Sequence, residues 1–342
     1  MSVRKWMAGA TVALVAVAAL AVVAGGSAAT AKQQAAPLKV ALITDIGGLN
    51  DKGFNALAYK GLIAAETQLG IKGRVFISHS SADYIPNLST AAKQGNNLVI
   101  AVGFLMGDSV AAMAKKYPHT KFAIVDVSAP TLMGKPKNVR GIDFAEQEAG
   151  CLAGVAAATE SKSGTISSVG GQAIPAVNAY IAGYQYCAKK VKPTIKTLNG
   201  YSQDFVAQDK CKSLALNQIG QGADVVFQVA GACGLGALTA AGDSKVWGIG
   251  VDADQAYLGS HVLTSALKKV DQGVLQTIQM VKNGTYKGGV DGLFNTKNGG
   301  VGFGTVSASA PKRAALITTL NKWAKLIANG TVKPPRTGIA NG

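Results

Sequence analysis

The chain has 342 residues, of which 48% are hydrophobic and 15% charged. This composition excludes a disordered protein, and the length suffices for two domains with separate cores. The formal net charge is +16, but the lysines are scattered and no arginine-rich helix is present, so we predict no nucleic-acid partner.

Residues 1–31 have the pattern of an export signal. Arg4 and Lys5 precede an apolar stretch at residues 8–23, and Ala29-Thr30-Ala31 predicts cleavage before Lys32. The alternative is an uncleaved anchor, because the stretch falls only slightly short of the roughly 20 residues that span a bilayer. No cysteine lies near the cleavage site, so we expect an exported protein, periplasmic or at the cell surface, without a lipid-modified N-terminal cysteine.

The first half of the chain alternates strands and helices. An apolar strand at residues 40–44 leads into a polar loop at 45–55 and a helix over 54–67. Short connections between successive elements predict a parallel sheet with right-handed crossovers. Further strands are expected at 74–78, 97–102, 121–127 and 139–144, and further helices at 83–95 and 109–116.

The pattern restarts near residues 144–148, which predicts a second α/β half. A tail then follows, and its order suggests that the chain crosses back between the two halves. In the second half, helices are expected at 146–159, 175–191, 206–220 and 237–241, and strands at 164–169, 194–199, 223–229 and 245–251. In the tail we expect a strand at 262–268, helices at 270–282 and 314–329, and an irregular or hairpin segment at 293–303.

Four cysteines in an exported chain permit disulfides, and four cysteines allow three pairings. We favour Cys187 with Cys211, because both fall on segments predicted to be neighbouring helices. Cys151 lies in an apolar helical pattern and is interpreted as a small buried hydrophobic residue. The three histidines are far apart and have no cysteine or carboxylate at ligand spacing, so neither a metal site nor a cofactor is predicted.

Polar or glycine-rich loops follow several of the apolar strands. Ligands of open α/β sheets bind at this carboxyl edge of the strands, so two lobes facing each other would form an acidic, glycine-lined cleft. Carboxylates suit hydroxyl and amide donors, and aromatic rings can stack on a planar ligand. The loops are 45–55, 103–108, Asp126, 231–236 and 252–255, and the aromatic residues are Phe54, Phe104 and Phe205.

Each of these features has a purely structural alternative. Asp45 and Asp108 could cap helices, and Phe54 and Phe205 could be core residues. Residues 231–236, GACGLG, lack both the GxGxxG order and the Walker lysine. No catalytic constellation is present, which argues against an enzyme, although a carboxylate such as Asp252 could act as acid or base.

Together the loops resemble the basic membrane protein family of substrate-binding proteins, which deliver purine nucleosides to ABC importers. The resemblance implies a type I periplasmic-binding-protein fold with two doubly wound parallel-sheet lobes and a multi-strand hinge. It assigns residues 38–145 plus 257–288 to the N-terminal lobe and 146–256 plus 289–342 to the C-terminal lobe. The matching stretches are TDIGGLNDKGFN (44–55), GFLMGD (103–108), FAIVD (122–126), FAEQEAGCLAG (144–154), AGACGLG (230–236), GVDADQ (250–255) and VLTSALKKVD (262–271).

The resemblance also implies roles for particular residues. Phe54 and Phe205 sandwich the base, Asp126 and Asn55 address its edge, Asp252 and Lys268 hold the ribose hydroxyls with help from Gly231, and Asp45 and Asn50 line the same pocket. The implied partners are a small-molecule ligand and an ABC permease. The protein is expected to be a monomer and, once its signal is cleaved, to contact the membrane only through the permease. Riboflavin or a sugar remains an alternative ligand, and the chain departs from the family pattern at Cys151, at Val206-Ala207 and in lacking the lipid-attachment cysteine.

Overall fold

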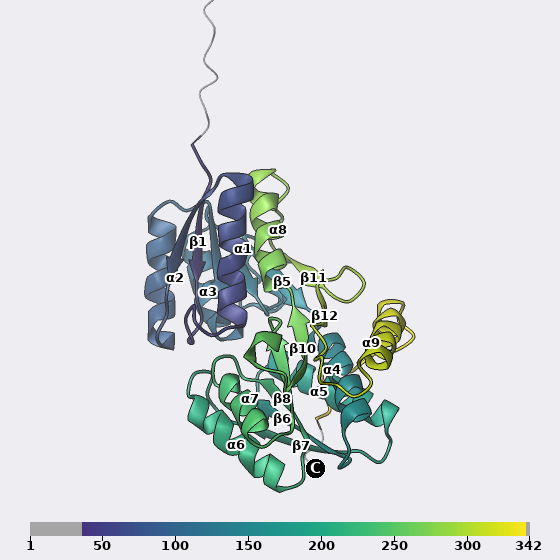
Figure 1. Cartoon of the computed structure of the whole chain (residues 1–342). Coiled ribbons are helices and arrows are strands. Elements are labelled where there is room, and N and C mark those ends of the chain that lie inside the picture. Colours follow the sequence, from purple (N-terminus) through teal and green to yellow (C-terminus); the bar gives the residue numbers. More distant parts are fainter. Residues whose placement is uncertain (1–35, 340–342) are drawn as a thin grey trace, which may run out of the picture. The chain divides into compact units, whose positions relative to one another are not determined.

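The computed structural model describes residues 36–339 and arranges them around two six-stranded sheets (Figure 1). The predicted export signal lies outside these residues. The first sheet has the order β11-β5-β4-β3-β1-β2 and the second β12-β10-β9-β8-β6-β7, and every pairing is parallel except that of β10 with β12. The first sheet comprises β1 (Lys39–Ile43), β2 (Lys72–Phe76), β3 (Leu98–Val102), β4 (Lys121–Val125), β5 (Val139–Phe144) and β11 (Val290–Phe294). The second comprises β6 (Thr165–Gly170), β7 (Lys196–Tyr201), β8 (Val225–Val229), β9 (Trp247–Asp252), β10 (Val262–Lys268) and β12 (Val301–Phe303).

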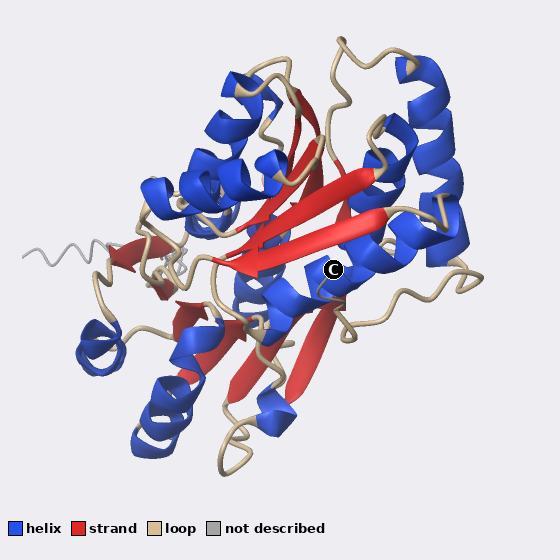
Figure 2. Cartoon of the chain, turned by 90° about the horizontal axis from the view of Figure 1, so that it is seen from below, coloured by secondary structure: helices blue, strands red, loops and turns tan. Residues whose placement is uncertain are grey.

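Helices flank the strands of both sheets (Figure 2), which explains why the central strand β3 is a continuous run of buried apolar residues and why β8 is fully buried, with Gln228 as its one polar residue. With the first sheet lie α1 (Phe54–Leu69), α2 (Tyr84–Lys93), α3 (Gly107–Lys116) and α8 (Val270–Lys282). With the second lie α4 (Glu146–Glu160), α5 (Pro175–Val191), α6 (Gln208–Gly220), α7 (Gly234–Asp243) and α9 (Arg313–Ala328). Within residues 36–339, none of the helices has the length and apolar character needed to cross a bilayer.

The predicted fold class is confirmed, since two parallel-sheet α/β lobes are present. From Pro37 onward the chain forms one compact unit that contains both sheets. The chain crosses between the sheets after β5, after β10, and between β11 and β12. These crossings form the expected multi-strand connection.

The predicted lobe boundaries place β10 in the first sheet and β11 in the second, and both placements are wrong. Strand β10 pairs with β9 in the second sheet, and β11 pairs in parallel with β5 in the first, from Val290 opposite Arg140 to Phe294 opposite Phe144. Residues 293–303 are therefore not a hairpin, because β12 instead pairs antiparallel with β10. Apolar periodicity marks a strand but does not say which sheet it joins after a crossover, so the order of elements was insufficient here.

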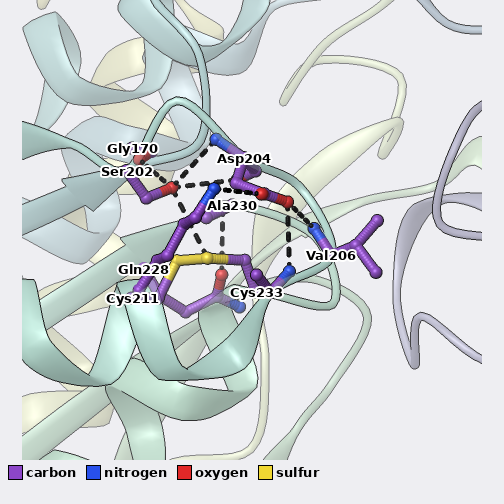
Figure 3. Close-up of a disulfide and its surroundings, with 10 residues drawn as sticks. Gly170, Ser202, Asp204, Val206, Cys211, Gln228, Ala230 and Cys233 are labelled. Carbon is purple, nitrogen blue, oxygen red and sulfur yellow. Dashed lines mark hydrogen bonds and ion pairs between the residues drawn. A yellow bond between two sulfur atoms is a disulfide. The ribbon is translucent and has the colours of Figure 1, made fainter.

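The predicted cysteine pairing is wrong. Cys151 is bonded to Cys187, and Cys211 to Cys233 (Figure 3). Cys151 is fully buried as expected, but it joins α4 to α5. These two helices approach so closely that a Cβ on Gly150 would lie 2.0 Å from the Tyr180 carbonyl oxygen, and the Cα atoms of Cys151 and Cys187 are 4.9 Å apart.

Candidate ligand-binding site

A cavity that is partly open to solvent lies where the carboxyl ends of strands from both sheets meet. Every one of the loops singled out in the sequence contributes to its lining. Asn50 is the exception among the predicted ligand residues, because it is exposed and does not line the cavity. The other predicted residues, Asp45, Phe54, Asn55, Asp126, Phe205, Gly231, Asp252 and Lys268, all line it, as do Phe104 and Tyr180.

Asp126 and Asp252 occupy equivalent positions in the two halves. Asp126 directly follows β4, and Asp252 is the last residue of β9; each of these strands is the third in the order of its sheet. The φ angles of Asp126 and Asp252 are 66° and 60°. Non-glycine residues seldom adopt this left-handed conformation, and Asp tolerates it better than most. Such strain is stored preferentially at functional sites. Each lobe thus presents to the cavity one carboxylate that stands at the end of a strand in this conformation.

Lys268, the last residue of β10, joins the two halves electrostatically. Its Nζ lies 2.7 Å from Asp126 Oδ2 and 3.7 Å from Glu146 Oε1, and its side chain is only 2% exposed. The ammonium group also sits 4.7 Å from the centre of the Phe54 ring. Burial alone lowers the pKa of Lys268, but Asp126, Asp252 and Glu146 together raise that pKa above its ordinary value. Lys268 is therefore charged, and Asp126 is the nearer of its two ion-pair partners.

Glu146 and Arg336 complete this charge cluster, and sequence reasoning missed both. Glu146 begins α4, two positions after the end of β5. Its Oε2 lies 2.7 Å from the guanidinium of Arg336, which also donates to the Phe144 carbonyl oxygen at 3.0 Å. Burial raises the pKa of Glu146 to about 7, against the opposing effect of Lys268. An acidic residue at the start of a helix that follows a strand was the available signal for Glu146. Nothing in the sequence places Arg336 beside it.

The loop after β1 is held together by its own polar side chains. Asp51 accepts hydrogen bonds from the backbone N–H groups of Gly53, Asn55 and Ala56, and so caps α1. Asn55 Oδ1 accepts from the Asp45 N–H at 2.9 Å, and its amide group donates to Asp51 Oδ2 at 3.1 Å. Most of the hydrogen-bonding capacity of Asn55 is thus used within the loop, which leaves one amide hydrogen for a ligand.

Asp45 does not cap a helix. Its Oδ1 accepts from the Ile46 N–H at 2.7 Å and from the hydroxyl of Tyr84. Burial raises the pKa of Asp45 to about 6. Burial likewise raises the pKa of Asp252 to about 6, with Lys268 opposing the shift. The cavity therefore holds carboxylates that ionise close to neutral pH.

Phe54 and Phe205 reach the cavity from opposite halves of the chain. Phe54 begins α1, Phe205 lies between β7 and α6, and both rings are partly buried. The Phe205 ring covers Gly171, where a Cβ would lie 2.3 Å from it, so only glycine fits at that position. The Phe205 carbonyl oxygen accepts from the Cys233 N–H at 3.1 Å, which ties this aromatic residue to the loop containing Gly231, whose φ is 56°.

Asp143 on β5 provides a prediction about pH. Burial and the neighbouring Asp291, to which it is hydrogen bonded, raise the pKa of Asp143 from 3.8 to about 8. Because the folded pKa is the higher one, the stability that this proton provides is present below pH 4 and is lost as the pH rises to 8. Asp143→Asn keeps a donor for Asp291, so we expect it to stabilise the protein by about 1 kcal/mol at pH 8 relative to wild type, and less at pH 5. Thermal melts at both pH values test this, and an equal difference at the two would contradict it.

Comparison with known proteins gives consistent matches. The family described as ABC transporter substrate-binding protein PnrA-like, abbreviated Bmp, matches residues 38–336. The chain is 35% identical over 331 residues to the ABC transporter nucleoside-binding protein BmpA of Lactococcus lactis, covering 89% of this chain and 93% of the relative. It is 34% identical over 296 residues to an uncharacterized lipoprotein of Pyrococcus horikoshii, covering 82% and 72%.

Solved structures show the same fold. An ABC transporter solute-binding protein from Aeropyrum pernix K1 superposes with a TM-score of 0.78 at 24% identity, covering 87% of this chain and 94% of the other. A second such protein, from Conexibacter woesei, superposes with a TM-score of 0.69 at 23% identity. At these identities the similarity establishes the arrangement of the two lobes and no more.

Proposed function

Since the chain belongs to the Bmp family of PnrA-like ABC transporter substrate-binding proteins, we propose that it is exported, binds a purine nucleoside and delivers it unchanged to the permease of an ABC importer. The resemblance inferred from the sequence motifs is confirmed at the level of the family. The nucleoside, the permease and the exported, monomeric state are our proposals, supported by the name of the Lactococcus relative and by the cavity.

The observation that carries this proposal is that one cavity contains two aromatic rings and two carboxylates, each of which has one oxygen bonded within the protein. Asp126 Oδ1 is buried and has no hydrogen-bond partner among the described residues, although Oδ2 is paired with Lys268. A buried acceptor left unpaired costs about 1–3 kcal/mol, which a ligand N–H or O–H donor recovers. Phe54 and Phe205 offer flat surfaces to a base, and Asp252 an acceptor to the sugar.

The charge of the cavity further favours an uncharged ligand. Lys268 is the one cation among the lining residues of the described chain, and it is already paired with Asp126. A phosphate group would meet carboxylates and find no free cation. We therefore propose nucleosides rather than nucleotides as the ligand class.

A thermal-shift screen of the mature protein against nucleosides, riboflavin and sugars tests this proposal. A ligand at 100 times its Kd stabilises the folded state by about 2.7 kcal/mol. We expect inosine, adenosine or guanosine to raise the melting temperature and the corresponding monophosphates not to do so. The absence of a shift with any nucleoside would refute the proposed ligand class, and a shift with riboflavin or a sugar alone would replace it.

Phe54→Ala tests the stacking role directly. Loss of one stacked base costs about 1–3 kcal/mol, so we expect the Kd for the nucleoside to rise roughly 5- to 150-fold. Isothermal titration calorimetry measures this change. The matched control is Phe76→Ala, which removes another partly buried ring of the first lobe that lies outside the cavity lining. If both variants lose melting temperature alike and neither loses affinity, Phe54 is a core residue.

A further inference from the structure

Tyr180 is a cavity residue that the motifs did not indicate. It lies on α5, lines the cavity, and is 2% exposed. Its hydroxyl donates a hydrogen bond to Asp252 Oδ1 at 3.0 Å. The ring packs edge-on against Phe227, with ring centres 6.1 Å apart, so the phenol has little freedom to turn away.

The helix that carries Tyr180 is fixed in position by its neighbour. Gly150 and Gly183 let α4 and α5 touch, since a Cβ on either glycine would lie 2.0 Å from a backbone oxygen of the other helix. The disulfide from Cys151 to Cys187 joins the same two helices. The position of the hydroxyl relative to β9 is therefore set by the packing of the backbone, which is the condition for a side chain that orients another.

The two strand-end carboxylates are used in parallel ways. The protein satisfies one oxygen of each, Asp126 Oδ2 through Lys268 and Asp252 Oδ1 through Tyr180. Asp126 Oδ1 is buried and has no hydrogen-bond partner among the described residues. The hydrogen bond from Tyr180 uses Asp252 Oδ1 and leaves Oδ2 as the other acceptor of that carboxylate. One acceptor from each lobe is thus left for a ligand in the shared cavity.

We propose that Tyr180 is a positioning residue, which holds Asp252 so that Oδ2 accepts a hydrogen bond from a ribose hydroxyl of the ligand. This inference rests on the proposed function. Without the Tyr180 hydroxyl, both oxygens of Asp252 compete for the same donor and the carboxylate can rotate. In the intact protein, Tyr180 therefore favours ligands whose sugar carries hydroxyl groups, although it does not itself stack on the base.

The chain supplies a matched control one helical turn away. Tyr184 lies on the same helix, is fully buried, packs on the same Phe227 ring, and its hydroxyl has no hydrogen-bond partner among the described residues. Tyr180→Phe and Tyr184→Phe therefore remove the same atom from similar surroundings. Only the first of them changes a contact to Asp252.

Calorimetric titration of both variants with inosine and with 2′,3′-dideoxyinosine tests the inference. We expect Tyr180→Phe to weaken inosine binding about five- to tenfold and to leave dideoxyinosine binding unchanged, and Tyr184→Phe to change neither. In an Asp252→Asn background, Tyr180→Phe should have no further effect. Equal losses for both ligands, or no loss, would refute the positioning role while the nucleoside site stands. If the wild-type protein binds no nucleoside, the proposed function fails and this inference fails with it.

Discussion

Lys268→Met is expected to lower the free energy of unfolding by about 3–5 kcal/mol at pH 8 and to abolish nucleoside binding. The substitution removes the cation that faces Asp126, Glu146 and Asp252, and the methionine side chain cannot compensate three buried carboxylates. Repulsion among these groups would also open the contact between β10 and the end of β4. Urea unfolding of the unliganded protein measures the loss.

The same variant should recover part of its stability in acid. The pKa of Glu146 is raised to about 7 and that of Asp252 to about 6 in the intact protein, with burial the main cause of each. Without Lys268 both pKa values rise further, so at pH 5 these groups are protonated and the repulsion weakens. A deficit of equal size at pH 5 and pH 8 would mean that lost packing, and not charge, explains the effect.

Lys60→Met is the matched control for this prediction. Lys60 pairs with Asp271 at 3.2 Å, but its side chain is 69% exposed. Exposed ion pairs contribute between zero and about 1 kcal/mol, so this variant should unfold almost like wild type. Similar losses for the two lysine variants would contradict the assignment of Lys268 to a buried cluster.

The sequence predicted the fold well because its strongest signals are local. Buried strands such as residues 98–102 are uninterrupted apolar runs, and the loops that follow them carry the cavity residues. The carboxyl ends of parallel strands share one edge of a sheet, so Asp45, Asp126 and Asp252 could be brought together before their distances were known. The sheet to which β10 and β11 belong could not be predicted in this way. The apolar pattern of a strand is the same whichever of the two sheets it joins after a crossover.

The partners within the site were harder to predict than its members. Asp252 and Lys268 were expected to hold the ribose together, but the structure pairs Lys268 with Asp126, while the Tyr180 hydroxyl donates to Asp252. Asn55 was expected to face the ligand, yet its amide group mainly braces the loop. Asn50 lies outside the cavity lining altogether. These contacts join residues far apart in the chain or depend on rotamers, neither of which has a spacing rule.

The two disulfides should be separable by their effects on ligand binding. We expect Cys211→Ala/Cys233→Ala and Cys151→Ala/Cys187→Ala each to lower the free energy of unfolding by about 3–4 kcal/mol, because the bonds close loops of 22 and 36 residues. All four cysteines are fully buried, so alanine leaves no unpaired polar group. Urea unfolding under non-reducing conditions measures both losses.

Of the two double variants, only Cys211→Ala/Cys233→Ala should loosen the wall of the cavity. Cys233 directly follows Gly231 and Ala232, which line the cavity, and its N–H donates to the carbonyl oxygen of Phe205 at 3.1 Å. The bond to Cys211 anchors this loop to α6, as the close-up in Figure 3 shows. Cys211→Ala/Cys233→Ala should therefore raise the Kd for a nucleoside several-fold at 25 °C. Because α4 and α5 remain in contact through their glycines, Cys151→Ala/Cys187→Ala should bind with wild-type affinity. Equal affinities in the two double variants would show that the hydrogen bond to Phe205 holds the loop without the disulfide.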